Sequence, residues 1–224
     1  MARGRLLVLE GVEGAGKSTQ AARLHRALES AGRDVVLVRE PGGTPLGERI
    51  RALLLASQNE MSPAAEALLF MASRAELVHR VIRPALDRGT TVIADRFFLS
   101  TYAYQCGGRA LPETVVRQAN WLATSGLTPD LTLLLHLPPE AGLARAAGRS
   151  EADRMERAGV EFHARVAAAF RAAERPEWQA SHPECGPIAA IDASGTEDEV
   201  ADRVATAVMG AFPELAVGAA AEAS

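Results

Sequence analysis

A glycine-rich segment near the N-terminus constrains the fold of this chain more than any other feature of its sequence. The segment reads GVEGAGKS over Gly11–Ser18 and matches the pattern G-x-x-x-x-G-K-[ST]. It follows the apolar run Leu6–Leu9, which is typical of a short buried strand. It precedes a helical pattern that begins at Lys17 and stops at Gly32. A strand, a glycine-rich turn and a helix in this order favour an α/β fold.

The residue types of Gly11–Ser18 suit an anionic ligand. Glycines let the backbone curl so that successive N–H groups face an anion, with a helix N-terminus behind them. In such a P-loop the lysine reaches the β- and γ-phosphates of a nucleoside triphosphate, and the Ser18 hydroxyl ligates Mg²⁺. A chain of this composition would contain roughly 7 × 10⁻⁴ chance matches. The predicted ATP-binding residues are Gly11, Val12, Glu13, Gly14, Ala15, Gly16, Lys17, Ser18 and Thr19.

The composition of the basic residues singles out Lys17. Lysine and arginine together number 24, and Lys17 is the only lysine among them. An ammonium is a compact point charge and a guanidinium is a wide fork, so lysine at this position indicates a narrow space around the charge. A GTPase would be expected to read its base with an Asn-Lys-x-Asp motif, which this chain cannot form. The length of 224 residues suits a small-molecule kinase better than an ATP-driven motor.

The overall composition narrows the class further. Hydrophobic residues make up 48% of the chain and charged residues 23%, which is typical of a soluble globular protein. No apolar run approaches the roughly 20 residues needed to cross a bilayer. The net charge of -4 disfavours binding to nucleic acid through bulk charge. We therefore expect a cytoplasmic enzyme with neither a membrane nor a nucleic acid as its partner.

Strand and helix patterns alternate along the whole chain. Apolar runs of strand length lie at Leu6–Leu9, Val35–Val38, Thr90–Ala94, Leu131–Leu137 and Ile188–Ile191. Helical patterns lie between and after these runs. One opens with Ser62 as N-cap and Pro63 at the first helical position, and another covers about Arg154–Ala173. The alternation predicts a five-stranded parallel sheet covered by helices on both faces. We expect one domain over residues 1–212 and a frayed tail over 213–224. In such sheets, ligands bind beyond the carboxyl ends of the strands.

Three further segments resemble the signatures of the thymidylate kinase family. They read REPGGT at Arg39–Thr44, LFMASR at Leu69–Arg74 and DRFFLSTYAYQ at Asp95–Gln105. The resemblance extends from about Arg5 to Met209. It implies a P-loop NTPase fold of the nucleoside monophosphate kinase type with a lid. It further implies transfer of a phosphoryl group from ATP to dTMP with Mg²⁺, in the pathway to dTTP, by a homodimer.

Asp95 and Arg96 follow the strand predicted at Thr90–Ala94. A carboxylate at this edge of the sheet can reach the coordination shell of Mg²⁺, and an arginine can form a fork of hydrogen bonds to a phosphate. A pair that merely closes the strand is the alternative. The resemblance implies that Arg96 binds the phosphate of the acceptor and acts in catalysis with Lys17, and that Asp95 assists the metal.

Phe70 and Arg74 lie four residues apart on a predicted helix and share one of its faces. From the spacing alone, a core phenylalanine beside a surface arginine is the better interpretation. The resemblance implies instead that Phe70 stacks on thymine and that Arg74 donates to its O4. The other acceptor-binding residues that it implies are Glu13 at the 3′-hydroxyl, Arg39 at the phosphate, and Ser100, Tyr102 and Gln105 around the sugar and base, with Tyr102 crowding out a 2′-hydroxyl.

The remaining question is which arginine stabilises the transferred phosphoryl group. Some members of the family carry it in the P-loop, at the position that Gly14 occupies here. The arginines at 145, 149, 154 and 157 instead resemble the lid of the bacterial type, over residues of about 145–158. We predict Arg149 as the catalytic arginine, and a solvated charged face is the alternative for each of the four.

Other functions remain open at this point. A deoxynucleoside kinase or another nucleoside monophosphate kinase would use the same P-loop. A non-catalytic ATP-binding regulator is less favoured, because binding alone does not need Lys17, Ser18, Asp95 and Arg96 together. Cys106 stands where the family usually has glycine, and it is either a neutral substitution or a reactive thiol.

Overall fold

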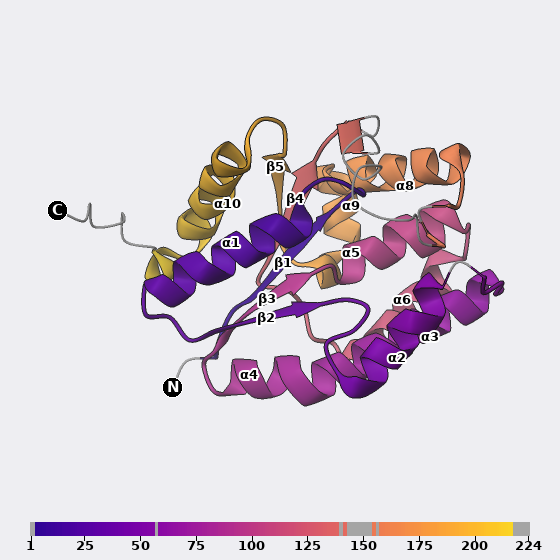
Figure 1. Cartoon of the computed structure of the whole chain (residues 1–224), viewed down its shortest axis with the longest axis horizontal. Helices are drawn as coiled ribbons and strands as arrows, with labels where there is room; N and C mark the ends of the chain where they lie inside the picture. Colours follow the sequence, from indigo (N-terminus) through magenta and orange to yellow (C-terminus); the bar gives the residue numbers. More distant parts are fainter. Residues whose placement is uncertain (1–2, 57, 139–140, 143–153, 156, 217–224) are drawn as a thin grey trace.

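The computed structural model describes residues 3–56, 58–138, 141–142, 154–155 and 157–216. Within these ranges, five parallel strands form one sheet in the order β2-β3-β1-β4-β5 (Figure 1). The strands are β1 (Leu6–Gly11), β2 (Val35–Arg39), β3 (Thr91–Asp95), β4 (Leu131–His136) and β5 (Ile188–Asp192). The prediction of an α/β fold with five parallel strands is confirmed.

Helices of three kinds connect these strands. The α-helices are α1 (Lys17–Ser30), α2 (Pro45–Leu55), α3 (Pro63–Leu77), α4 (Arg83–Asp87), α5 (Phe98–Thr101), α6 (Glu113–Thr124), α8 (Val160–Ala173), α9 (Pro176–Ser181) and α10 (Glu197–Ala211). Two π-helices, η1 (Val78–Ile82) and η2 (Tyr102–Gly108), directly continue α3 and α5. Two short 3₁₀ turns are η3 (Pro183–Cys185) and η4 (Pro213–Leu215).

The central strand β1 is buried on both faces. Leu7 and Leu9 join a cluster with apolar residues of α1 and α10, which lie side by side on one face of the sheet (Figure 1). Leu6 and Val8 join a second cluster with residues of α3, η1 and α4. Because helices cover both faces, the strand is apolar at every one of these positions rather than at alternate ones.

The N-termini of α2 and α3 share one sequence signal, a hydroxyl residue followed by proline. Ser62 precedes Pro63 and its hydroxyl accepts a hydrogen bond from the N–H of Ala65 at 3.2 Å, as expected from the sequence. Thr44 precedes Pro45 in the same way and accepts from Gly47 at 2.9 Å. Only the first of these pairs is among the sequence-based expectations, so α2 is an addition to the predicted helices.

The helix predicted from Ser62 onward continues through η1 into α4. Pro84 lies in the first turn of α4. Proline has no N–H to donate, and its ring clashes with the carbonyl four residues before it. A local π turn directly before Pro84 relieves this clash without ending the helix. Pro84 is therefore the sequence feature that accounts for the wider turn of η1.

The C-terminal region differs from its prediction at two points. The helix predicted from Arg154 begins only at Val160, because Gly159 has a φ of 87° that a helix cannot contain. The tail was expected to fray from 213, but Leu215 in η4 is buried in the core and Glu214 accepts from Arg5 at 2.9 Å. Residues 217–224 lie outside the described part of the chain, as does most of the predicted lid.

Candidate active site

The carboxyl ends of three strands meet at one edge of the sheet. The register pairs Leu9 of β1 with Asp95 of β3, and Asp95 in turn with Arg39 of β2. In the sheet, β1 lies between β3 and β4. The connection after β1 leads to β2 on one side of it, and the connection after β3 leads to β4 on the other side. This arrangement opens a crevice where α/β proteins bind their ligands. The glycine-rich loop Gly11–Ser18 lies in it.

Gly14 has to be glycine in this loop. Its φ of 73° lies in the left-handed region. A Cβ atom at this position would also lie 2.0 Å from the backbone oxygen of Gly142. The position cannot carry an arginine without displacing the backbone beside it. This finding agrees with a lid, rather than the loop, as the source of a further arginine.

Lys17 crosses the interior of the glycine-rich loop. Its side chain is buried, and Nζ donates to the backbone oxygen of Val12 at 2.7 Å. Burial and the neighbouring charge of Arg96 lower the pKa of Lys17 to about 8, although Glu13 and Asp95 act in the opposite direction. At neutral pH the ammonium is therefore charged. It can donate to a phosphate oxygen in place of the backbone oxygen of Val12.

Ser18 and Asp95 are in direct contact, since the serine hydroxyl donates to Oδ2 of Asp95 at 2.5 Å. Over the described ranges, no group of three or more His, Cys, Asp or Glu side chains could hold a metal ion by itself. A hydroxyl and a carboxylate are hard oxygen ligands. They fit Mg²⁺, which takes one or two protein ligands and completes its shell with phosphate oxygens and water. The two residues predicted as metal ligands thus lie together.

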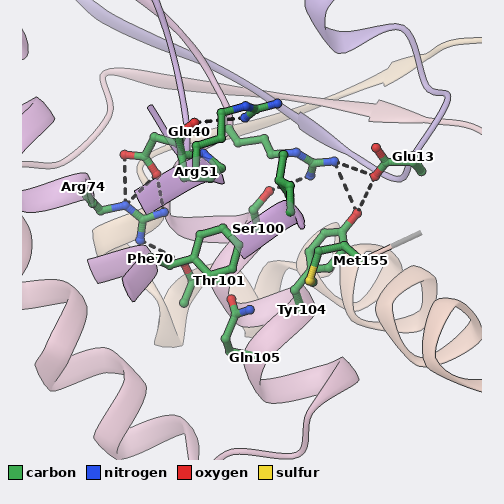
Figure 2. Close-up of a pocket in the computed structure, with 13 residues that line it drawn as sticks. Glu13, Glu40, Arg51, Phe70, Arg74, Ser100, Thr101, Tyr104, Gln105 and Met155 are labelled. Atoms are coloured by element: carbon green, nitrogen blue, oxygen red, sulfur yellow. Dashed lines mark hydrogen bonds and ion pairs between the residues drawn. The ribbon is translucent and has the colours of Figure 1, made fainter. Parts of the chain in front are cut away.

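A pocket of about 590 Å³ opens beside the glycine-rich loop (Figure 2). Its lining residues come from the loops and helices that follow β1, β2 and β3, together with one residue near the end of the predicted lid. They are Glu13, Glu40, Pro41, Arg51, Leu55, Phe70, Arg74, Arg96, Ser100, Thr101, Tyr104, Gln105 and Met155. Six of the predicted acceptor-binding residues are therefore brought together: Glu13, Phe70, Arg74, Arg96, Ser100 and Gln105.

Arg96 connects this pocket to the glycine-rich loop. Its guanidinium donates to Oε2 of Glu13 and to Oγ of Ser100, both at 2.9 Å. Its φ of 74° is rare for a residue with a side chain, and such strained backbones cluster at functional sites. Burial would raise the pKa of Glu13, but Arg96 and Lys17 outweigh it and lower the pKa to about 2. Both partners are therefore charged across the neutral range.

Glu10 is linked to Arg96 through the hydroxyl of Ser100, and no local sequence pattern indicates this role. The carboxylate is fully buried and accepts hydrogen bonds from the N–H groups of Phe97 and Ser100 at 2.8 and 3.0 Å. It also accepts from the Ser100 hydroxyl at 2.6 Å. Burial raises the pKa of Glu10, although Arg96 opposes the change. An acidic side chain here fixes the start of α5 through its free N–H groups.

Arg74 is buried, and it lines the pocket with every N–H group already engaged. Nε and one terminal nitrogen donate to the Glu40 carboxylate, at 2.8 and 2.5 Å. The terminal nitrogens also donate to Thr101 and the backbone of Phe97, each at 2.8 Å, and to the amide oxygen of Asn120. A guanidinium has five N–H donors. An N–H group that donates to O4 of thymine would also have to donate to one of these partners. The bond between Arg74 and thymine stays a prediction.

The pocket contains Tyr104 and not Tyr102. The ring of Tyr102 lies edge-on to those of Trp178 and His182, and its hydroxyl donates to Glu184. The hydroxyl of Tyr104 donates to Glu13 at 3.0 Å. Tyr102 therefore does not line the pocket as expected, and Tyr104 lies there instead. The spacing contained the signal, because Tyr104 lies four residues after Ser100 and shares its helix face.

Arg39 lies outside the pocket as well. Its side chain is 56% exposed and donates to Glu48 of α2 at 3.1 Å. Arg51, also on α2, lines the pocket and donates to the backbone oxygen of Pro41 at 3.0 Å. The structure therefore does not bring Arg39 to the pocket as expected, and Arg51 lies there instead. No motif in the sequence marks Arg51, because the helix that carries it is not among the predicted ones.

The predicted lid is described only at its C-terminal end. The predicted catalytic residue Arg149 lies outside the described residues, and its role stays a prediction. Arg154 is held in place, since Nε donates to the backbone oxygen of Leu54 at 2.8 Å and a terminal nitrogen donates to Glu66 at 2.7 Å. Arg154 therefore anchors the end of this segment to α2 and α3.

A second hollow of about 640 Å³ also borders the glycine-rich loop. It is bounded by Gly14, Gly16, Thr19 and Gln20 and, near the junction of β5 and α10, by Ala193, Gly195, Thr196 and Glu197. Gln20 joins the two walls, because its amide nitrogen donates to the backbone oxygen of Glu197 at 2.9 Å. The glycine-rich loop thus contributes residues to both cavities, Glu13 to the first and Gly14–Gly16 to the second.

Cys106 is not an activated thiol. Burial, together with the nearby charge of Glu113, raises its pKa to about 11. The thiolate is the reactive form, and it is scarce at neutral pH when the pKa is this high. The interpretation of Cys106 as a neutral substitution is therefore favoured over a reactive thiol.

Comparison with known proteins identifies the family. A model of the family "Thymidylate kinase" matches residues 9–184. The thymidylate kinase of Deinococcus radiodurans is 47% identical over 208 residues, covering 93% of this chain and 98% of the relative. That of Chlorobaculum parvum is 45% identical, covering 91% and 94%. The crystal structure of thymidylate kinase from Ehrlichia chaffeensis superposes with a TM-score of 0.72 at 28% identity, over 92% of this chain and 99% of that one. The chain therefore belongs to the thymidylate kinase family.

Proposed function

We propose that this protein transfers the γ-phosphoryl group of ATP to dTMP, with Mg²⁺, and releases ADP and dTDP. The observation that carries the proposal is the position of Arg96. This arginine lines the pocket and donates to Glu13 of the glycine-rich loop. A phosphate bound by Arg96 and Arg51 would therefore lie next to the phosphates that the loop binds.

The pocket suits a deoxynucleotide with a flat pyrimidine base. Phe70 offers an aromatic ring for stacking, and Leu55 and Met155 add apolar surface. Gln105 offers an amide to the polar edge of the base. Tyr104 lies between this end and Glu13, where its ring would crowd a 2′-hydroxyl and favour a deoxyribose.

The reaction needs no protein base, because the acceptor phosphate is already ionised. One of its oxygens attacks the γ-phosphorus, the bond to the bridging β–γ oxygen breaks, and ADP leaves with that oxygen. Lys17 and Arg96 orient the two phosphate groups and neutralise their charge, as Arg149 of the lid would also do. Ser18 and Asp95 would hold Mg²⁺, which neutralises further charge on the phosphates when it is bound.

The second hollow would receive the nucleoside part of ATP. It is lined by other residues of the loop than the acceptor pocket, so the phosphate chain would run along the loop toward Arg96. Gln20 and Thr196, which line this hollow, would bound the base. In-line transfer requires the attacking oxygen and the leaving ADP on opposite sides of the moving phosphoryl group, and ATP bound here with dTMP in the first pocket would meet that requirement.

The assembly that we propose is a cytoplasmic homodimer of single-domain chains. Leu68 of α3 and Val115 and Leu122 of α6 are exposed, and α3 packs directly against α6. Apolar residues on two adjoining helices support an interface with a second copy. In the described part of the chain, no helix combines the length and apolarity needed to cross a membrane.

The test is ADP release by the full chain with ATP, Mg²⁺ and one acceptor at a time: dTMP, dUMP, dCMP, dGMP, AMP or thymidine. We expect strong turnover on dTMP, weaker turnover on dUMP and near-background rates on the others. Because one methyl group is worth about 10–200-fold in a pocket, dUMP should not be silent. Preference for thymidine or another monophosphate would reassign the acceptor, and ATP binding without any turnover would indicate a regulator.

A further inference from the structure

Glu66, on the first turn of α3, is a buried carboxylate outside the pocket lining. Its side chain is only 1% exposed. It accepts from Nε2 of Gln105 at 3.0 Å, from Arg109 at 2.9 and 3.1 Å, and from Arg154 at 2.7 Å. These three donors come from the middle of η2, from the residue after it and from the end of the predicted lid. Glu66 therefore ties one pocket residue to two arginines.

The carboxylate is ionised and has little freedom to turn. Burial would raise the pKa of Glu66, but hydrogen bonds from Arg109, Arg154 and Gln105 outweigh burial and hold the pKa below its ordinary value. A carboxylate offers about four lone-pair sites, and these three donors occupy them. Rotation would break a bond to at least one arginine. The partner that Gln105 faces is thus fixed in place and in charge.

An ionised carboxylate decides which end of the Gln105 amide faces it. Because a carboxylate only accepts hydrogen bonds, the NH₂ end must point to Glu66 and the carbonyl oxygen must point away. The Gln105 side chain is buried and lines the pocket. Figure 2 shows its amide end turned toward the ring of Phe70. The carbonyl oxygen of Gln105 therefore faces the pocket as an acceptor at this position.

We propose that Glu66 is a positioning residue that sets the base specificity of the acceptor site, by holding the carbonyl oxygen of Gln105 toward the base. The inference rests on the proposed binding of the acceptor base beside Phe70 and Gln105. Thymine and uracil carry an N3–H that this oxygen accepts. Cytosine has a bare N3, which would face the oxygen as a second acceptor. The Glu66–Gln105 pair thus rejects cytosine and is indifferent to the methyl group of thymine.

The test compares three acceptors in Glu66→Gln and the wild type. An amide at position 66 has both a donor and an acceptor, so Gln105 can then turn either end to the base. We expect the ratio of kcat/KM for dTMP over dCMP to fall at least about tenfold, because a polar site loses its discrimination when its donor–acceptor pattern is lost. The ratio for dTMP over dUMP should stay within about twofold, since both bases carry N3–H.

A second variant separates positioning from general loosening. Gln105→Leu should lose the same discrimination between dTMP and dCMP, and adding Glu66→Gln to it should change that ratio no further, because the two residues act through one contact. An unchanged ratio in Glu66→Gln, an equal fall on all three acceptors, or a further loss in the double variant would each overturn the proposal. A wild-type chain inactive on dTMP would instead overturn the proposed function.

Glu66→Gln removes the charge that two arginines face, so this variant can fail to fold. A measurement on the wild-type chain covers that outcome. The Gln105 side-chain amide signals, assigned by their loss in Gln105→Leu, should include a slowly exchanging proton both in the free protein and with dTMP bound. Fast exchange of both amide protons in the dTMP complex would contradict a bond from Gln105 to Glu66 and overturn the proposal.

Discussion

Arg96 donates to the carboxylate of Glu13 at 2.9 Å, and this ion pair joins the end of β3 to the glycine-rich loop. Arg96 follows a strand and Glu13 lies in a turn, and the two residues are 83 positions apart in the sequence. A base pocket and a phosphate loop could exist separately in a fold of this kind. Here they share a charged pair, so a ligand phosphate that engages Arg96 also meets the loop.

The first prediction concerns Lys17. Lys17→Ala should lower kcat by at least about 10²–10³-fold, the scale for losing one preorganised donor at a reacting phosphate. Lys17→Arg should not restore the rate, because the site is buried and a guanidinium is wider than an ammonium. Steady-state ADP release measures both, with the exposed Arg26→Ala on the same helix as control. Turnover of Lys17→Ala near that of the wild type would remove the loop from the mechanism.

The second prediction distinguishes the two tyrosines. Tyr104→Ala should admit a ribonucleotide, so the preference for dTMP over its ribose counterpart should fall by about tenfold or more when the crowding ring is removed. Tyr102→Ala should leave this preference unchanged, since its hydroxyl bonds Glu184 and its ring faces Trp178. The ratio of kcat/KM values for the two acceptors measures the effect. A larger change in the Tyr102 variant would reinstate the original assignment.

The third prediction concerns stability. Glu40→Gln leaves the buried guanidinium of Arg74 without its carboxylate, and breaking such a pair costs about 3–5 kcal/mol of the free energy of unfolding. Glu76→Gln removes the partner of the exposed Arg80 and should cost less than about 0.5 kcal/mol. Urea unfolding of both variants gives the comparison. Equal costs would mean that the buried pair has no special role in the fold.

The fourth prediction concerns pH and Cys106. With a pKa of about 11, the thiol should alkylate roughly 10²-fold more slowly at pH 8 than a free cysteine, because only the thiolate reacts. Since the raised pKa keeps the thiol protonated, the rate should rise about tenfold per pH unit up to about pH 11. Iodoacetamide labelling followed by mass spectrometry measures it, with Cys106→Ala to separate the buried Cys185. Rapid labelling at pH 7 would indicate an activated thiol after all.

The sequence predicted the sheet and the glycine-rich loop, and local signals explain why. Each strand is a short and mostly apolar run, and Lys17 lies within a motif whose spacing is read directly along the chain. Ser62 and Pro63 likewise mark a helix start without reference to anything distant. These features depend on neighbours along the chain, so one sequence suffices to find them.

The features that escaped prediction depend on contacts between distant residues. Arg74 lies 34 positions from Glu40, and Glu66 lies 39 positions from Gln105. Nothing in the local pattern distinguishes such a buried carboxylate from a solvated one. The exchange of Tyr102 for Tyr104 has another cause. The family signature gives residue types in order along the chain, and it does not state which face of the helix each side chain occupies.

The shape of the pocket depends on the number of residues in the π-helix η2. It places Tyr104 and Gln105 in the pocket while Tyr102 packs in the core, and each of its turns holds more residues than an α-helix allows. Removal of one residue within 102–108 would favour an ordinary helix and rotate every later side chain away from its partner. Evolution can therefore vary the residues of this segment more readily than their number. A deletion there would remove the acceptor pocket even if every residue named above were still present.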